Sequence, residues 1–248
     1  LQSLDFLHLY ETKHCTLQLG GQDQWGNITS GLELIRKKHG ADVECYGLTM
    51  PLITKADGTK FGKTESGTVW LDPKKTSPYE MYQFLVNAED AKVVEYLKRL
   101  TFLDKEEIVR LEECVKNEPH LREAQKVLGR EVVTFLHGSD AYETALKITN
   151  ALFRGNIREL SADEQRDALS SMEKVQVSEA MDLASTLVSA KIASSKREAR
   201  EWIKSGSIQI NGEKVQDETR VIDASSALVD DMILIKRGKR NYYVLTFA

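Results

Sequence analysis

A stretch rich in lysine and glycine is the part of this sequence best suited to chemistry. Residues 55–67 contain three lysines and three glycines and almost no apolar side chain. Glycine lets backbone amides approach an anion closely, lysine supplies a mobile positive charge, and threonine and serine hydroxyls add neutral donors. This composition suits a polyphosphate, with a solvated basic loop as the alternative. The spacing of a P-loop is absent.

The order Lys60-Phe61-Gly62-Lys63-Thr64 is more specific than its composition. It resembles the KMSKS signature of class I aminoacyl-tRNA synthetases, in the form typical of the tyrosyl-tRNA synthetases of bacteria, and the resemblance extends over essentially the whole chain. It implies that Lys60, Lys63 and Thr64 are catalytic and that Lys63 also binds ATP. Positioned cations stabilise the charge that builds on the α-phosphate and on departing pyrophosphate more than they stabilise bound ATP.

A polar turn after a short apolar stretch forms a second candidate site. On its residues alone, Gly21-Gln22-Asp23-Gln24 fits a strand-to-helix turn in which Asp23 caps the helix. The segment also resembles the second signature of the same family, usually Gly-Gly-Ser-Asp-Gln, with Gln22 in place of the serine. The resemblance implies that Gly21 and Asp23 contact the adenosine part of ATP and that Gln24 contacts tyrosine or its activated carboxyl group.

Two polar residues near the start of the chain are the third candidate. Gln2 and Asp5 are three residues apart, so they share one face of a helix. On the residues alone, they are two polar side chains on the exposed side of that helix. The resemblance places both in a tyrosine pocket: Gln2 would bind the α-amino group and Asp5 would accept a hydrogen bond from the phenolic hydroxyl.

The bulk composition restricts the remaining possibilities. The chain has 248 residues and a net charge of −4, so nucleic-acid binding requires a local basic patch. Its three cysteines are far apart and its five histidines show no ligand spacing, so we expect neither disulfides nor a metal site. No signal peptide or long apolar run is present, which predicts a cytoplasmic protein with no membrane partner.

The periodicity of apolar residues predicts that the chain consists of an α/β part, then an α part, then an α+β part. Strand, glycine turn, helix and strand follow one another up to residue 48, as in one unit of a parallel sheet, whose ligands bind beyond the carboxyl ends of the strands. The predicted domains are the C-terminal part of a Rossmann-like class I catalytic domain (1–67, with the loop 60–64), a helical anticodon-binding domain (68–155), a linker (156–178) and an S-four-like RNA-binding domain (179–248).

The last predicted domain carries clustered positive charge. One helix face and one turn supply the residues predicted to bind tRNA, with a solvated charged face as the alternative. The helix is expected to start at Ser194 or Ser195, and an Asn-Gly turn at 211–212 predicts a hairpin. The set comprises Lys196, Arg197, Arg200, Lys204, Lys236, Arg237, Lys239 and Arg240.

The resemblance implies a tyrosine–tRNA ligase that uses ATP with Mg²⁺ to form tyrosyl-adenylate and passes tyrosine to the 3′ end of tRNA(Tyr), as a homodimer when complete. No His-x-Gly-His sequence occurs. We therefore expect the chain to begin inside the catalytic domain, to be inactive in adenylate formation alone, and still to bind tRNA. The alternatives are a non-catalytic RNA-binding module and a related class I synthetase for tryptophan.

Overall fold

The computed structural model describes residues 1–64, 67–170, 172–177, 179–238 and 241–247. The chain forms two compact units, Leu1–Ser66 and Gly67–Ala248, which are considered separately below. Across the described ranges, no helix has the length and apolar character needed to cross a membrane.

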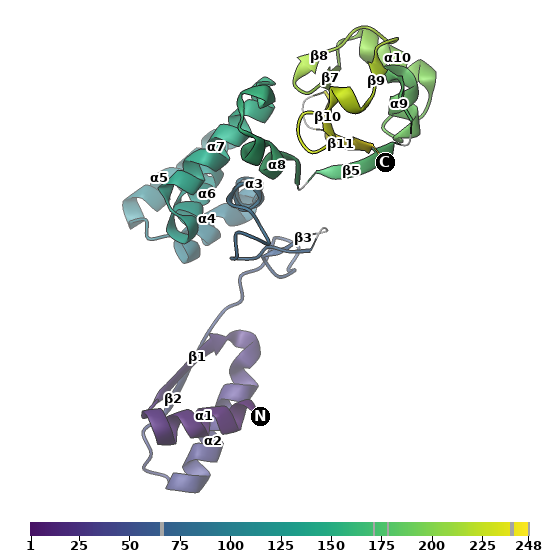
Figure 1. Cartoon of the computed structure of the whole chain (residues 1–248). Coiled ribbons are helices and arrows are strands. Elements are labelled where there is room, and N and C mark those ends of the chain that lie inside the picture. Colours follow the sequence, from purple (N-terminus) through teal and green to yellow (C-terminus); the bar gives the residue numbers. More distant parts are fainter. Residues whose placement is uncertain (65–66, 171, 178, 239–240, 248) are drawn as a thin grey trace. The chain divides into compact units, whose positions relative to one another are not determined.

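The first unit contains the expected strand–helix–strand arrangement (Figure 1). Its two strands are parallel, with Leu17 opposite Tyr46 and Gly21 opposite Met50. A helix crosses between them, as parallel strands require. The elements are α1 (Gln2–Lys13), β1 (Leu17–Gly21), the 3₁₀ turn η1 (Gln22–Gln24), α2 (Trp25–His39), β2 (Tyr46–Met50) and β3 (Lys63–Thr64).

The two helices of this unit pack through a small apolar core. Phe6 and Leu7 of α1 are buried with Ile35 of α2. Helix α2 also lies directly on β2, because a Cβ on Gly47 would come within 2.4 Å of Ile28 Cγ2. Glycine at this position is therefore a packing requirement that fixes α2 over the strands.

The other face of the β1–β2 sheet is apolar and exposed. Side chains on alternate positions of a strand share one face, and these positions carry large apolar groups with about half or more of their surface exposed. They are Leu17, Leu19, Tyr46, Leu48 and Met50.

The second unit begins with β4 (Gly67–Thr68) and continues as α-helices. The sequence Ser77-Pro78-Tyr79-Glu80 predicts a capping box at the start of the first helix, and this box forms: Ser77 Oγ accepts a hydrogen bond from Glu80 N, and Glu80 Oε2 accepts one from Ser77 N. This capping box satisfies two otherwise orphaned donors. The helices are α3 (Pro78–Val86), α4 (Asp90–Leu100), α5 (Lys105–Asn117), α6 (Glu123–His137) and α7 (Ser139–Arg154), with the 3₁₀ turn η2 (Pro119–Leu121).

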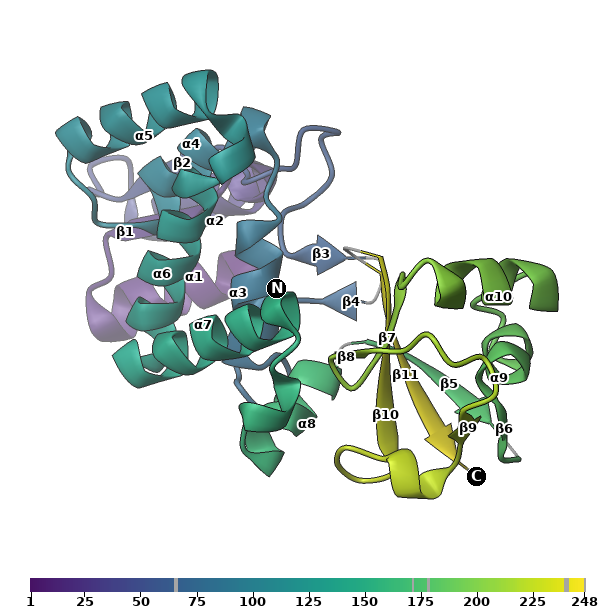
Figure 2. The same ribbon diagram turned by 90° about the horizontal axis from the view of Figure 1, so that it is seen from above.

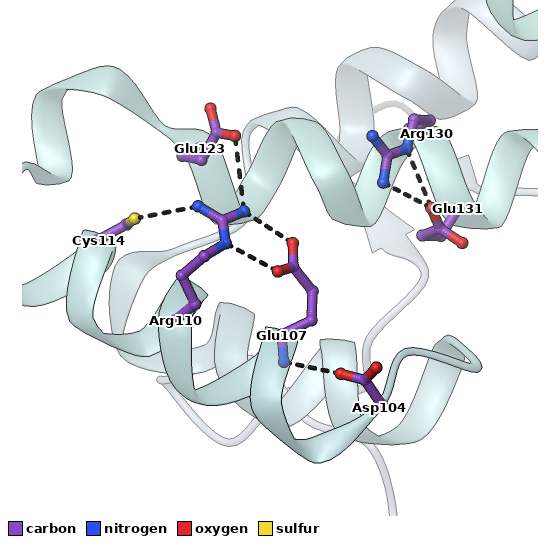
Figure 3. Close-up of polar contacts among 7 residues, drawn as sticks. All are labelled: Asp104, Glu107, Arg110, Cys114, Glu123, Arg130 and Glu131. Atoms are coloured by element: carbon purple, nitrogen blue, oxygen red, sulfur yellow. Dashed lines mark hydrogen bonds and ion pairs between the residues drawn. The ribbon is translucent and has the colours of Figure 1, made fainter.

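The sequence Asp104-Lys105-Glu106-Glu107 predicts a second capping box, which forms only in part. Asp104 Oδ1 accepts from Glu107 N at 2.8 Å, but Glu107 does not return the contact. Its carboxylate instead accepts two hydrogen bonds from Arg110, each of 2.7 Å (Figure 3). Arg110 also reaches Glu123 at 4.0 Å and therefore ties α5 to α6. A bidentate arginine pair is a stronger interaction for the carboxylate than a single backbone amide.

The stretch from 156 to 178, predicted as a linker, carries regular structure. It contains the 3₁₀ turn η3 (Ile157–Glu159), α8 (Ala162–Ser170) and β5 (Glu173–Val177). Strand β5 pairs in parallel with the last strand of the chain. Its polar Glu-Lys-Val-Gln-Val sequence does not resemble a buried strand because β5 lies at the edge of its sheet.

The C-terminal part contains a five-stranded sheet in the order β5-β11-β10-β7-β8 and a two-stranded sheet of β6 and β9. Helices α9 and α10 lie on one side of the five-stranded sheet (Figure 2). The predicted turn at Asn211-Gly212 is confirmed, with positive φ at both residues and antiparallel strands on either side. The elements are β6 (Met181–Asp182), α9 (Leu183–Ser189), α10 (Lys196–Lys204), β7 (Ile208–Ile210), β8 (Glu213–Lys214), β9 (Val221–Ile222), the 3₁₀ turn η4 (Ala224–Ser226), β10 (Met232–Arg237) and β11 (Asn241–Phe247).

Candidate functional site

The lysine-rich stretch forms a short hairpin arm, defined here as residues 51–61. Phe61 N donates to Ile53 O at 3.1 Å, and Lys55 N donates to Thr59 O at 2.8 Å. Between these contacts Thr54 and Lys60 form an antiparallel bridge. The arm follows β2 directly, so it projects from the carboxyl end of the parallel strands. This hairpin was not expected from the sequence.

The tip of the arm is fixed by Asp57. Its Oδ1 accepts hydrogen bonds from Thr59 Oγ1 at 2.6 Å and from Thr59 N at 2.9 Å. The side-chain hydrogen bond from Thr59, followed by the backbone one, holds the pKa of Asp57 below its usual range. Asp-Gly is a strong turn signal, so Asp57-Gly58 is the sequence feature that could have indicated the hairpin.

The base of the arm meets the polar turn at the end of β1. Lys60 Nζ lies 3.8 Å from Asp23 Oδ2, and both side chains are exposed. Asp23 does not cap α2: the N-cap residue of that helix is Gln24, which makes no side-chain capping hydrogen bond. The capping alternative for Asp23 is therefore not supported.

The backbone of this turn has little room for a side chain at Gly21. A Cβ on Gly21 would lie 2.7 Å from Asp23 Oδ1 and 3.0 Å from Leu52 Cδ2, so only glycine fits there without rearrangement. Gln24 is partly buried, and its Oε1 accepts a hydrogen bond from Asn27 Nδ2 at 3.0 Å. The structure thus brings Gly21, Asp23 and Lys60 together at the carboxyl end of β1.

The remaining predicted site residues of the first unit lie away from this turn in the sequence. Lys63 and Thr64 form β3, two residues after the arm. Gln2 and Asp5 lie in the first turns of α1 and are exposed. No described side-chain hydrogen bond or ion pair joins these two α1 residues to Gly21, Asp23 or Gln24.

Helix α10 presents the predicted basic face. Ser195 Oγ caps it by accepting from Glu198 N, as expected for one of the two serines. All four of its predicted RNA-binding residues are exposed: Lys196, Arg197, Arg200 and Lys204. Their neighbours neutralise part of this charge, since Arg197 lies 3.8 Å from Glu201 and Arg200 forms an ion pair of 3.3 Å with Glu218.

Arg237 adds to this face from β10. Its guanidinium lies 4.6 Å from the ring centroid of Trp202 in α10, and its Nη1 donates to Ile192 O at 3.3 Å. The stacking on Trp202 holds the guanidinium in a defined orientation. The pattern of charges in the sequence could not predict the contact between Arg237 and Trp202, because the two residues are 35 positions apart.

Lys236 does not lie on the basic face. Its side chain is only 6% exposed, and Nζ donates to Leu152 O at 3.1 Å and to Phe153 O at 3.3 Å. The residues of β10 from Met232 to Lys236 are all buried. The sequence had instead predicted that Lys236 belongs to an exposed basic turn. Lys239 and Arg240, the other residues of that turn, lie outside the described residues.

No group of three histidine, cysteine, aspartate or glutamate side chains in the described ranges could hold a metal ion.

Comparison with known proteins connects both regions to one family. The model of class I tRNA synthetases (W and Y) matches residues 1–154, and that of the tyrosine–tRNA ligase SYY-like C-terminal domain matches residues 164–245. The tyrosine–tRNA ligase of Bacillus pumilus is 52% identical and that of Staphylococcus carnosus 50% identical, each over 100% of this chain and 59% of the relative.

A solved structure agrees with these matches. A C-terminally truncated mitochondrial tyrosyl-tRNA synthetase of Coccidioides posadasii is similar with a TM-score of 0.50 and 37% identity, covering 59% of this chain and 42% of that one. The chain spans about 59% of the length of the curated relatives it matches. With a family model covering residues 1–154 and curated relatives aligned over all 248 residues, the chain belongs to the class I tRNA synthetases of the W and Y family.

Proposed function

We propose that this chain is the part of a tyrosine–tRNA ligase that holds the phosphate-binding loop, the adenosine turn and the tRNA-binding parts. The complete reaction joins tyrosine to ATP as tyrosyl-adenylate, releases pyrophosphate and transfers tyrosine to the 3′ end of tRNA(Tyr). Such chemistry depends on positioning and electrostatic stabilisation, without a protein nucleophile.

The observation that supports the proposal most directly is the ion pair between Lys60 and Asp23. The pair lies at the carboxyl end of β1, where nucleotides bind to parallel sheets. Lys60 and Lys63 would stabilise the charge on the α-phosphate and pyrophosphate, with Thr64 as a neutral donor and Lys63 also binding ATP. Gly21 and Asp23 would contact the adenosine, and Mg²⁺ would accompany the phosphates.

The residues proposed to bind the amino acid lie on α1 and on the turn that follows β1. Gln2 would bind the α-amino group of tyrosine, Asp5 would accept from its phenolic hydroxyl, and Gln24 would contact its carboxyl group once activated. Tyrosine is favoured over tryptophan because the C-terminal match is to a domain of tyrosine–tRNA ligases.

The second unit would bind tRNA(Tyr). The helices α3–α7 would serve as the anticodon-binding part, and α10 with Arg237 would contact RNA phosphates through the C-terminal part. The complete enzyme would act as a homodimer in the cytoplasm. A purely RNA-binding module is less well supported, because such a protein has no use for the hairpin arm beside Asp23.

The test is tyrosine-dependent exchange of pyrophosphate into ATP, measured on this chain and on a version extended upstream to the length of the relatives. We expect exchange by the extended chain and none by the 248-residue chain. If the extended chain shows no exchange with tyrosine but shows it with tryptophan, the substrate assignment is wrong. Exchange by the 248-residue chain alone would overturn the division of the site between the two parts.

A further inference from the structure

Lys236 is a positive charge in a buried position that the tRNA-binding proposal does not use. Burying an ammonium group is costly unless its protons are hydrogen-bonded. The described contacts of Lys236 include no carboxylate: they are the two backbone carbonyls of Leu152 and Phe153 and the ring of Tyr242, whose centroid lies 5.1 Å from Nζ.

These carbonyls belong to the last turn of α7. The final carbonyls of a helix have no partner within the helix and form the negative end of its dipole. Lys236 therefore caps α7 from a strand more than 80 residues away in sequence. Tyr242 of β11 strengthens the same contact, since its hydroxyl donates to Leu152 O at 3.3 Å.

Further contacts within the second unit lie around this cap. The turn between β7 and β8 touches the end of α7, because a Cβ on Gly212 would lie 1.9 Å from Gly155 O. On α8, Arg166 forms two hydrogen bonds with Asp230 in the loop before β10. Helix α8 is itself held on α7 by Lys147, which pairs with Glu164 at 2.7 Å.

We propose that Lys236 is a positioning residue that latches the C-terminal sheet onto the end of α7. The latch gives the basic face of α10 a fixed orientation relative to helices α3–α7, so that one RNA molecule contacts both at once. The RNA part of this inference rests on the proposed function. Two sites in fixed geometry bind with a higher effective concentration than two sites on a mobile connection.

The first experiment measures the latch without RNA. In ¹⁵N relaxation of the 248-residue chain, we expect helices α3–α7 and the C-terminal sheet to share one rotational correlation time. Lys236→Met keeps an unbranched side chain, one heavy atom shorter, but removes the ammonium, and should give the sheet a shorter correlation time than the helices. Lys204→Met, an exposed lysine on α10, is the matched control and should leave the two values equal.

Tyr242→Phe provides a second test in case Lys236→Met does not fold. It keeps the ring and removes only the hydroxyl that donates to Leu152 O. We expect the same separation of correlation times, but smaller. Equal values in both variants, with the fold intact, would overturn the latch.

The second experiment measures binding of a tyrosine-accepting tRNA transcript over a range of salt concentrations. Loss of the latch should weaken binding about tenfold through lower effective concentration, with an unchanged slope against salt because no phosphate contact is lost. Lys204→Met should instead reduce the slope. If Lys236→Met reduces the slope and leaves the correlation times equal, Lys236 contacts RNA and the latch is wrong. Failure of tRNA to bind the wild-type chain would refute the proposed function but not the relaxation result.

Discussion

Lys60 Nζ lies 3.8 Å from Asp23 Oδ2, which places a cation assigned to phosphates beside a carboxylate assigned to adenosine. Both side chains are exposed, so the pair contributes only about 0–1 kcal/mol to folding. Because the pair is weak, Lys60 and Asp23 can give it up for contacts with a nucleotide at little cost in free energy. The contact therefore contributes little to the stability of the fold, which is compatible with the role proposed for it in nucleotide binding.

Lys60→Ala in the extended, active enzyme should slow adenylate formation by about 100-fold, the usual loss when one preorganised donor is removed. The free energy of unfolding should change little. Pyrophosphate exchange and urea unfolding measure the two quantities. Lys37→Ala, an exposed lysine on α2, is the control and should change neither. A rate loss below threefold for Lys60→Ala would remove it from the catalytic set.

Asp5→Ala in the extended enzyme should reduce the preference for tyrosine over phenylalanine, because the acceptor for the phenolic hydroxyl is lost. That preference has been measured as roughly 10⁵ in a tyrosyl-tRNA synthetase. Gln2→Ala is the contrast: it should weaken both amino acids equally, since both carry the α-amino group. The ratio of kcat/KM for the two amino acids is the measurement. An unchanged ratio in Asp5→Ala would refute the pocket assignment.

Charge reversal at Lys196 and Arg200 on α10 should weaken tRNA binding and reduce its dependence on salt by about one unit of slope per lost phosphate contact. Both side chains are exposed, so the fold should be unaffected. Filter binding at several salt concentrations tests this, with Lys37→Glu in the first unit as the control. Identical slopes for wild type and the α10 variants would show a solvated surface with no RNA contact.

Gly129→Ala should destabilise the protein, although alanine ordinarily stabilises a helix interior by about 1 kcal/mol over glycine. The reason is that a Cβ on Gly129 would lie 2.7 Å from Tyr82 Cδ2, in a buried contact between α6 and α3. Overpacking of this kind costs about 1–3 kcal/mol. Thermal unfolding followed by circular dichroism measures the effect. Gly26→Ala, where a Cβ meets nothing within 4 Å, should show the ordinary stabilisation.

Asp167→Asn should stabilise the protein at pH 7. Burial, followed by the nearby carboxylates of Glu80 and Asp163, raises the pKa of Asp167 above 3.8. The folded state therefore holds this proton more tightly, and the associated stability is complete below pH 3.8 and lost as pH rises through the folded pKa. Urea unfolding across a pH series should show the variant's advantage disappearing in acid.

Asp217→Asn is the control for this prediction, with the opposite sign. The hydrogen bonds from Thr219 lower the pKa of Asp217, so its contribution is present at neutral pH and lost as pH falls. Its replacement should reduce stability at pH 7. If both variants shift stability in the same direction at pH 7, the assignment of these two electrostatic environments is wrong.

The sequence predicted well those features that depend on near neighbours. The box at Ser77 and the turn at Asn211-Gly212 follow from residues within a few positions of each other. The strand–helix–strand order follows from the periodicity of apolar residues within each element. Hydrogen bonds from side chains to nearby backbone groups favour such caps and turns. The capping box predicted at Asp104 is an exception, because the Glu107 carboxylate that it requires pairs with Arg110 instead.

The features that the sequence did not predict depend on distant partners. Lys236 followed by arginine, glycine and two more basic residues has the composition of an exposed turn, yet its position is set by α7, more than 80 residues earlier. The polar strand β5 is specified by β11 in the same way. The meeting of Lys60 with Asp23 could be inferred only by resemblance, because no local pattern brings residue 60 back to residue 23.

The exposed apolar face of the β1–β2 sheet favours association between copies of this chain. The sheet has two strands among the described residues and carries five large apolar side chains on its open face. Unpaired strand edges beside such a face favour strand addition between molecules. Light scattering should therefore show self-association that grows with protein concentration, and a charge introduced at Leu48 should suppress it.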